Sequence, residues 1–430
     1  MARIVLNTFG SLGDIHPFLA IAIELCRRGH QATVATSEVY RAKIEAEGVG
    51  FAPVRPDLGG MLDNKDLIEK VWDARRGTEY LLKDVILPRI EESFEDLDAA
   101  SHGADLLITH SAGFAGPIVA ELRKLPWLSA VLQPMAFLSA YDPPLIAPAP
   151  WLKHTYRFGK WPFRFARRFA RMAVTPWIEP IRRLRARLGL RTPKHPLFEG
   201  QFSPYGTLAL FSSHFANTQP DWPPNSYVTG FVFYDQLGAG LGDYARHSQT
   251  AVAQTLAEFL ANGAAPIVFT LGSSAVMHPG DFFHESLLAV RQLGARAVLL
   301  VGRDSLDRFA SDNHSIFAAD YAPYSLLMPH ASAIVHQGGI GTTAQALRAG
   351  RPMLVIPWAH DQPDNAERLR SLGVARVIGR SKYKAGLAAR ELANLLRNPA
   401  YLGKATDLSK KIAPEQGIRA ASDRIEAALI

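Results

Sequence analysis

Two glycine-rich stretches of the sequence hold the residues best suited to chemistry. The first, Gly10-Ser-Leu-Gly-Asp-Ile-His-Pro-Phe, places Asp14 near the N-cap of a predicted helix, with Pro17 in its first turn. A carboxylate partly shielded from water there could act as a general base, or it could only cap the helix. The second, His336-Gln-Gly-Gly-Ile-Gly-Thr-Thr, combines glycines that allow close backbone approach with hydroxyl donors at a helix N-terminus. That combination suits a phosphate or diphosphate.

Both stretches lie between a predicted strand and a predicted helix. Residues 4–7 are predicted to form a buried strand before the first loop, and residues 18–28 the helix after it. Residues 333–335 and 342–347 flank the second loop in the same way. Ligands of open parallel α/β sheets bind beyond the carboxyl ends of the strands, so each loop is expected at a ligand-binding edge.

The rest of the chain continues the alternation of short apolar runs and helical patterns. This alternation predicts an α/β fold with two parallel sheets facing a cleft, joined by a proline-containing linker at residues 217–234. A long polar helix is expected over residues 64–100, with a break near Pro88. Further strands are predicted at residues 31–36, 50–54, 105–109, 127–132, 267–271, 297–301, 315–318 and 353–356.

The composition narrows the class of protein. A chain of 430 residues with 48% hydrophobic and 20% charged residues suggests two or three globular domains and argues against disorder. The single cysteine, Cys26, excludes a disulfide scaffold or a cysteine-rich metal site, and we expect it to be buried. No apolar run approaches the ~18 residues of a membrane span. We therefore expect a soluble, cytoplasmic protein.

The net charge of +7 comes from one segment. Residues 151–190 hold eleven lysines and arginines and one acid, Glu179, whereas the rest of the chain holds 36 basic and 39 acidic residues. This distribution argues against nucleic acid as a partner of the whole molecule. The segment is also rich in Trp and Phe. It could form an amphipathic helix that touches anionic lipid, helices that cover a ligand pocket with their aromatic rings inward, or inert surface.

The second loop and its continuation resemble a known family. The stretch from His336-Gln-Gly-Gly-Ile-Gly-Thr-Thr-Ala-Gln to Pro357-Trp-Ala-His-Asp-Gln-Pro-Asp-Asn-Ala resembles the donor signature of nucleotide-sugar-dependent glycosyltransferases of family 1. The first loop is similar to the acceptor-side loop of bacterial members, including sterol, antibiotic, rhamnolipid and flavonoid glycosyltransferases. Asp221-Trp-Pro and Thr229-Gly-Phe match the usual linker.

The resemblance implies the GT-B architecture of two Rossmann-like domains. Residues 1–220 would be the acceptor-binding domain, with the basic aromatic segment 151–190 inside it. Residues 221–250 would be the linker and residues 251–412 the donor-binding domain. Residues 413–430 would form a C-terminal helix that packs back on the first domain.

The resemblance also assigns roles on the donor side. His336 would bond the β-phosphate, and Tyr321 would stack on the nucleobase where the family usually has tryptophan. Gln345 replaces a glutamate that binds the ribose hydroxyls, which leans toward a deoxyribose donor such as a dTDP-sugar. The implied donor-binding residues are Ser273, Tyr321, Ala322, His336, Gly338, Gly339, Gly341, Thr342, Gln345, Asp361 and Gln362.

On the acceptor side, Asp14 takes the place of the catalytic base. The acidic residue that orients a catalytic histidine in other members is absent, and His110 lies near its expected position. His110 could therefore pair with Asp14 in a reversed dyad. The residues expected to bind the acceptor are His16, Ser111, Phe114, Met135 and Trp358.

The expected activity is inverting transfer of a hexose or 6-deoxyhexose, such as glucose or rhamnose, from a UDP- or dTDP-sugar. The expected acceptor is a hydroxyl of a hydrophobic small molecule, first a flavonoid or other polyphenol, because a phenol gives up its proton more easily than an alcohol. A lipid or sterol acceptor, a nucleotide-sugar 2-epimerase and a noncatalytic nucleotide-sugar-binding subunit are the alternatives. No cofactor or metal is expected, and the chain is expected to be a monomer or homodimer.

Overall fold

The chain folds into two compact units. The computed structural model describes residues 1–59, 64–192, 194–234, 254–309 and 314–429. The first unit comprises Met1–Tyr234 and Glu415–Ile430, and the second comprises Asp235–Pro414. The first unit therefore extends past the expected boundary at residue 220. Residues 235–250 of the expected linker lie outside the described residues.

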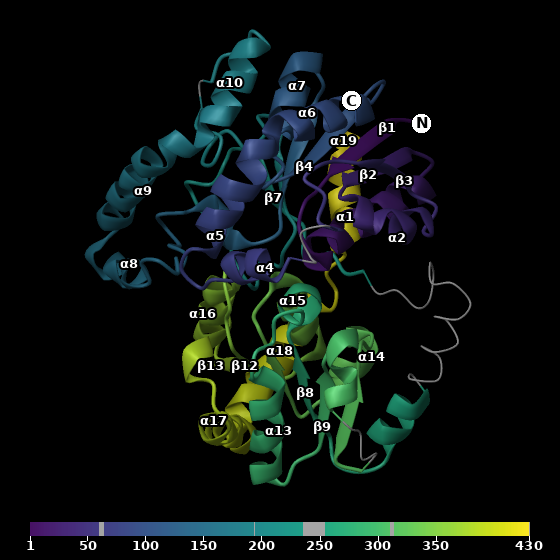
Figure 1. Ribbon diagram of the computed structural model, residues 1–430, viewed down its shortest axis with the longest axis vertical. Coiled ribbons are helices and arrows are strands. Elements are labelled where there is room, and N and C mark those ends of the chain that lie inside the picture. Colours follow the sequence, from purple (N-terminus) through teal and green to yellow (C-terminus); the bar gives the residue numbers. More distant parts are fainter. Residues whose placement is uncertain (60–63, 193, 235–253, 310–313, 430) are drawn as a thin grey trace. The chain divides into compact units, whose positions relative to one another are not determined.

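The first unit is built on a parallel sheet with the strand order β3-β2-β1-β4-β5-β6-β7 (Figure 1). Asn7 of β1 pairs with Thr109 of β4, so the loops that follow these two strands leave the same edge of the sheet as neighbours. The strands are β1 (Arg3–Asn7), β2 (Gln31–Thr36), β3 (Gly50–Pro53), β4 (Leu106–His110), β5 (Trp127–Val131), β6 (Thr207–Ala209) and β7 (Ser226–Val228).

Two of these strands differ from the prediction. Strands β6 and β7 have three residues each, and neither was expected. The predicted linker at residues 217–234 instead contains β7. Trp222, just before β7, is buried and stacks on Phe137 with ring centroids 4.0 Å apart. Its packing makes this proline-containing segment part of the first unit.

The first helix begins earlier than expected. α1 (Leu12–Arg27) starts at the N-cap Ser11 and contains Pro17 in its interior, whereas the prediction began the helix at residue 18. A capping box between Ser11 and Asp14 satisfies the first amides, which allows the helix to start before the proline. The other helices of the unit are α2 (Arg41–Glu45), α4 (Lys65–Val71), α5 (Gly77–Tyr80), α6 (Ile90–Ala100), α7 (Gly116–Arg123), α8 (Trp151–His154), α9 (Trp161–Val174), α10 (Glu179–Arg187) and α19 (Gly417–Ala427).

The long helix expected over residues 64–100 is divided into several pieces. α4 ends at Val71, α5 is followed by a π-helical stretch at Leu81–Ile86, and a 3₁₀ turn at Leu87–Arg89 leads into α6. The predicted break near Pro88 is therefore present. An additional interruption between α4 and α5 was not expected.

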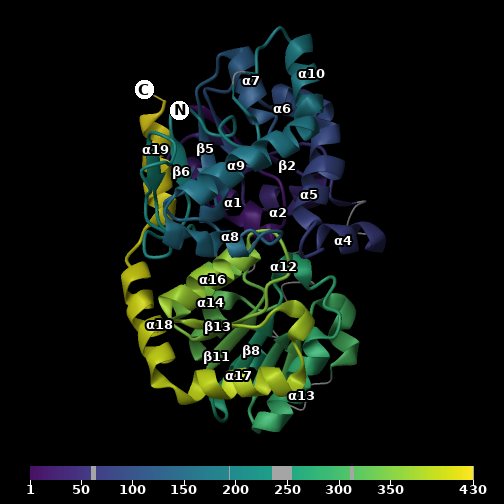
Figure 2. The same ribbon diagram turned by 90° about the vertical axis from the view of Figure 1, so that its left-hand side faces the viewer.

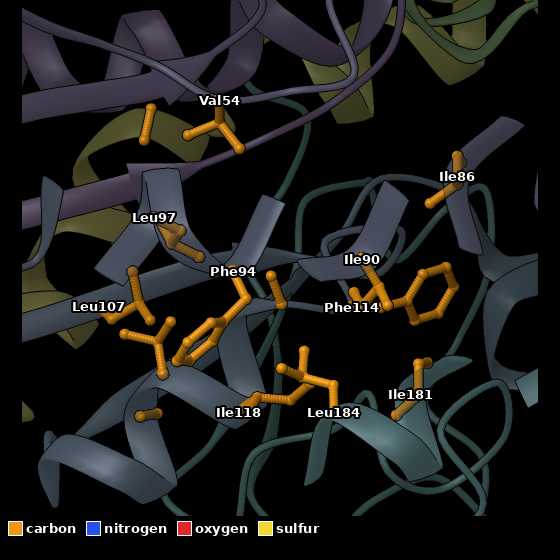
Figure 3. Close-up of a cluster of buried hydrophobic side chains, with 14 of the residues drawn as sticks. Val54, Ile86, Ile90, Phe94, Leu97, Leu107, Phe114, Ile118, Ile181 and Leu184 are labelled. Atoms are coloured by element: carbon orange, nitrogen blue, oxygen red, sulfur yellow. The ribbon is translucent and has the colours of Figure 1, made fainter. Parts of the chain in front are cut away.

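The core of the first unit lies between the sheet and helices α6, α7 and α10. Phe94 of α6, Ile118 of α7 and Leu184 of α10 converge over Leu107 of β4 (Figure 3). Each such side chain contributes about 1.5–3 kcal/mol by burial. This packing holds α7, and the loop before it, against the carboxyl end of β4.

The C-terminal helix α19 belongs to the first unit and packs on α1 (Figures 1 and 2). Arg28 donates to Asp423 and to Glu426, each at 2.6 Å. The Ser212 hydroxyl donates to Glu415 at 2.6 Å, where the chain re-enters the unit.

The second unit has a parallel sheet with the order β10-β9-β8-β11-β12-β13. The short strand β13 was not expected. The strands are β8 (Ile267–Thr270), β9 (Ala297–Leu300), β10 (Ile316–Ala319), β11 (Ala333–His336), β12 (Met353–Val355) and β13 (Ala375–Val377). The helices are α12 (Gly272–Ala275), α13 (Phe282–Leu293), α14 (Tyr324–Leu327), α15 (Ile340–Ala349), α16 (Gln362–Leu372), α17 (Ala385–Arg397) and α18 (Pro399–Ile412).

Candidate active site

The loop between β1 and α1 is shaped around the Asp14 carboxylate. Its Oδ2 accepts hydrogen bonds from the Ser11 amide at 2.8 Å and from the Ser11 hydroxyl at 3.2 Å. Asp14 is therefore the third residue of the helix, in a capping box, and not the N-cap that the sequence suggested. A Cβ at Gly10, where φ is +134°, would lie 2.3 Å from the same oxygen. Glycine is thus required where the loop passes the carboxylate.

Asp14 is half-buried, and this burial raises its pKa to about 6 although the Ser11 hydrogen bonds oppose the rise. The group is mostly ionised at neutral pH yet is a stronger base than an ordinary aspartate. Nearby, the Tyr40 hydroxyl donates to the Gly10 carbonyl at 2.9 Å. Burial and the Asp14 charge raise the pKa of Tyr40, so this phenol stays protonated.

His110 ends β4 and lies in the interior. Its ring meets Phe18 edge-on, with centroids 5.9 Å apart, and Phe18 is one helical turn after Asp14. Burial lowers the pKa of His110 to about 4, so the ring is neutral. The expected pairing with Asp14 is not formed, because neither ring nitrogen of His110 bonds a side chain of the described residues. His110 is nevertheless the last residue of β4, the strand that pairs with β1.

A cavity of about 410 Å³ extends from His110 along α7 within the first unit. Its walls come from the end of β4, from α7 and α10, and from residues 194–205. His110 and Phe114 lie at one end, and Lys124, Arg185 and Lys194 lie along the rest. The volume falls within the range of about 300–1,000 Å³ that is usual for small-molecule pockets.

The other acceptor-side candidates are more dispersed. The His16 ring packs on Tyr234, at the end of the first unit, with centroids 4.7 Å apart. Ser111 is buried, and Met135 is half-buried in a 3₁₀ turn. None of these three lines the cavity. Of the five residues expected to bind the acceptor, Phe114 alone shares the cavity with His110.

Trp358 was expected to bind the acceptor, but its side chain packs inside the second unit. Its side chain is 2% exposed, and its ring meets Phe282 edge-on at 5.6 Å and lies under the Arg380 guanidinium. A ring enclosed in this way does not present a face to an acceptor. Trp358 is close to Asp361 in the sequence, but the structure places its side chain in the core.

His336 ends β11 and is fully buried. The Gly338 amide donates to its Nδ1 at 3.1 Å, so the ring proton lies on Nε2, which has no hydrogen-bond partner among the described residues. Burial lowers the pKa of His336 to about 3, so the ring is a neutral donor. A buried N–H without a partner is a group that a ligand oxygen would satisfy. The Gly338 amide, expected to contact the donor, is already engaged by His336.

The loops after β8 and β11 fit closely together. A Cβ on Gly272, where φ is +67°, would lie 2.3 Å from the Gln337 amide nitrogen. The Tyr324 hydroxyl bonds Thr270 at 2.8 Å and also bonds Thr342, which it fixes at the start of α15. Sequence reasoning missed Gln337 and Tyr324. Gln337 could have been found from the sequence, because it lies inside the glycine-rich motif directly after His336.

The start of α16 is held by side chains of the expected sugar-binding pair. The Asn365 amide donates to Asp361 at 2.6 Å and to the Gly338 carbonyl at 2.9 Å, joining two loops. The side-chain oxygen of Gln362 accepts from the Trp358 amide at 2.8 Å. The amide NH₂ of Gln362 is therefore the part of that side chain left to read a sugar hydroxyl.

The remaining donor-side candidates differ in exposure. Tyr321 is exposed, and so is Ser273 in the short helix α12. Ala322 is buried. Gln345 is half-buried on α15, one turn after Gly341.

Two general properties complete the description. Among the described residues, no cluster of three His, Cys, Asp or Glu side chains could hold a metal ion. No helix in the described part of the chain has the length and apolar character needed to cross a bilayer.

Two family models match the chain. Residues 4–134 match the glycosyltransferase family 28 N-terminal domain, and residues 285–420 match the C-terminal domain of erythromycin biosynthesis protein CIII-like proteins. The first model describes glycosyltransferase family 28, whereas the resemblance seen in the sequence was to glycosyltransferase family 1.

Curated relatives match nearly the whole chain. O-mycaminosyltylonolide 6-deoxyallosyltransferase of Streptomyces fradiae is 30% identical over 99% of this chain and 97% of its own length. A sterol 3-beta-glucosyltransferase of Cryptococcus neoformans is 28% identical over 98% of this chain, which spans 27% of that longer protein.

Solved structures of glycosyltransferases share the fold of this chain. The calicheamicin glycosyltransferase CalG4 has a TM-score of 0.70 at 18% identity, with 100% of this chain and 98% of that chain covered. The glycosyltransferase VinC, solved in complex with dTDP, has a TM-score of 0.65 at 21% identity, with 99% of both chains covered. The chain belongs to the GT-B glycosyltransferases and is a transferase enzyme. The predicted class and fold are confirmed, and the epimerase and noncatalytic alternatives are set aside.

Proposed function

We propose that this enzyme transfers a hexose or 6-deoxyhexose from a UDP- or dTDP-sugar to a hydroxyl of a hydrophobic small molecule, with inversion. The observation that carries the proposal is Asp14. It is a half-buried carboxylate of pKa about 6 in the first turn of α1. The strand before α1, β1, pairs with β4, which ends at His110. A base whose pKa lies near the working pH is effective in general-base catalysis.

The reaction is a single displacement. Asp14 accepts the proton of the acceptor hydroxyl while the oxygen forms a bond to the anomeric carbon of the sugar. The bond from that carbon to the diphosphate breaks, and its electron pair leaves with the diphosphate. The acceptor oxygen enters on the face opposite the leaving group, so one step inverts the configuration.

The second unit stabilises the leaving diphosphate. His336 donates from Nε2, and Thr342 and the free amides at the start of α15 add further donors. These groups are neutral and are fixed before the reaction by Gly338 and Tyr324. The proposed mechanism therefore assigns no step to a metal ion or an additional cofactor.

The acceptor is proposed to enter the cavity between α7 and α10. Polyphenols stand first on chemical grounds, because the pKa of Asp14, about 6, is closer to that of a phenol, ≈ 10, than to that of an alcohol. The name of one relative, a sterol 3-beta-glucosyltransferase, supports the alternative of a sterol acceptor, and another relative is named for transfer to O-mycaminosyltylonolide. The half-buried amide of Gln345, in place of a carboxylate, favours a dTDP-sugar such as dTDP-rhamnose over UDP-glucose.

The test compares Asp14→Asn with Asp66→Asn, an exposed acid in the first turn of α4. We expect Asp14→Asn to lower kcat by about 10²–10⁴ and to leave donor binding unchanged, because the base is lost and the donor loop is intact. Asp66→Asn should behave as wild type. His336→Ala should instead weaken the thermal stabilisation produced by UDP- or dTDP-sugars. Full turnover by Asp14→Asn would refute the proposed base.

A further inference from the structure

Helix α9 carries a row of exposed aromatic side chains. Trp161 is 78% exposed, Phe165 74% and Phe169 66%. Each is four residues after the one before, so the three rings form a single stripe along the helix, which Met172 extends. Large apolar side chains in a continuous exposed stripe mark an interaction surface.

The stripe is continuous in sequence with other exposed rings. Trp151, Tyr156 and Phe158, in α8 and the turn after it, are also exposed. Among the described residues, every exposed Phe or Trp lies between residues 151 and 169. The exposed Phe and Trp rings of the described residues are therefore confined to one segment.

The opposite side of α9 is firmly packed on the first unit. Phe163 is 2% exposed and joins Ala140 and Leu152 in a small apolar cluster. Arg167 donates to the Leu138 carbonyl at 3.3 Å. The helix is thus held with its aromatic stripe outward from this unit. An acceptor lid with inward aromatic rings, one of the expected alternatives, does not fit this orientation.

Arginines run beside the stripe. Arg164, Arg168 and Arg171 follow the same helical spacing along the neighbouring side of α9. Arg171 also pairs with Glu199 at 2.8 Å, whereas Arg164 lies over the Tyr141 ring. Residues 151–172 hold seven lysines and arginines and no Asp or Glu, so this stretch of the chain is strongly cationic.

We infer that the face formed by residues 151–172 docks on an anionic lipid surface, with α9 lying in the plane of the interface. The aromatic stripe enters the boundary between headgroups and acyl chains, where Trp and Phe rings are favoured. The arginines beside it contact the lipid phosphates. The combination of exposed aromatic rings with a row of like positive charge is complementary to an anionic lipid surface. The inference does not depend on the identity of the sugar or the acceptor.

The experiment measures co-sedimentation of the whole protein with vesicles of phosphatidylcholine alone and of phosphatidylcholine with 30% phosphatidylglycerol. We expect at least about tenfold stronger partitioning to the anionic vesicles, and weaker binding at 0.5 M than at 0.1 M NaCl. A blue shift of tryptophan emission should accompany binding and should be smaller in Trp161→Phe. Equal binding to both vesicles, or no binding, would overturn the inference.

Two pairs of variants separate the stripe from general surface effects. Phe165→Ser with Phe169→Ser should abolish vesicle binding, whereas Leu396→Ser with Leu402→Ser, which alters exposed leucines of the second unit, should not.

Arg164→Gln with Arg168→Gln should weaken binding more than Arg75→Gln with Arg76→Gln, an equal change in net charge elsewhere. Equal losses within either pair contradict the inference. A dimer in sedimentation velocity that Phe165→Ser dissociates, without vesicle binding, would instead identify a second copy of the chain as the occupant.

Discussion

Asp14 serves two purposes that pull its chemistry in different directions. As the third residue of α1 it completes a capping box with Ser11, and in the proposed mechanism it accepts a proton from the acceptor hydroxyl. Burial raises the pKa of Asp14, which makes the carboxylate a stronger base but destabilises the folded protein when the group is ionised. The folded protein holds the Asp14 proton more tightly than the unfolded chain does.

This conflict predicts a pH-dependent effect of Asp14→Asn on stability. Because the folded pKa, about 6, lies above the ordinary 3.8, the contribution of Asp14 is fully present below about pH 4. It is lost as the pH rises through 6. The shift of about two units sets an upper bound of about 3 kcal/mol, and partial solvation reduces it to roughly 1–2 kcal/mol. Urea unfolding should therefore show the variant more stable than wild type at pH 8.

The advantage of the variant should shrink between pH 8 and pH 4, while Asp66→Asn should show no such trend. A constant difference across this range would mean that the pKa of Asp14 is not raised.

At the scale of single residues, the sequence predicted the candidate site residues but not the packing around them. Asp14 and His336 stand in glycine-rich loops that can be recognised from residue types alone. The burial of Trp358 could not be read in this way, because Phe282 and Arg380, which enclose its ring, are distant in sequence. The contact of Tyr324 with Thr342 is also set by tertiary packing.

At the scale of elements, the strand–loop–helix units that hold the site were predictable. β1 with α1 and β11 with α15 have apolar runs before the glycines and helical periodicity after them. The strands β6, β7 and β13 were not expected, whereas β12, which is equally short, was expected because it lies in the apolar run at residues 353–356. The start of α1 was placed too late, since the N-cap was expected near Asp14 and the structure has it at Ser11.

The loop before α1 gives a prediction at this scale. Gly10→Ala should lower turnover at least about tenfold, because the new Cβ would occupy the space of the Asp14 carboxylate oxygen, 2.3 Å away. Gly48→Ala is the matched control, since φ there is +72° and nothing lies within 4 Å of a Cβ. Both variants should lose about 1 kcal/mol of stability, and only Gly10→Ala should lose activity. Equal kcat values would show that the carboxylate adapts freely.

At the scale of the whole molecule, the first unit is assembled from two separate stretches of the chain. The contact of α19 with α1 buries Ile425 and Ala421 completely and adds the ion pairs of Arg28. The C-terminal helix was expected from the family resemblance, and its partners on α1 emerge only from the structure.

Ending the chain after Pro414 should therefore weaken the first unit alone. Loss of the buried Ile425 and its neighbours should cost about 2–4 kcal/mol of that unit's unfolding free energy. Limited proteolysis in urea can follow the two units separately, and a chain ending at Ala427 is the control. Equal destabilisation of the second unit would contradict this assignment of α19.

The return of residues 415–430 to the first unit also constrains how such enzymes can be recombined. A hybrid made with one crossover near residue 234 would carry a C-terminal helix from the wrong parent, set against an α1 that evolved with another. Asp423 and Glu426 would then face whatever the other parent has in place of Arg28. On the proposed placement of the acceptor in the first unit, exchange of acceptor specificity between relatives is expected to succeed by two crossovers, with both stretches inherited together.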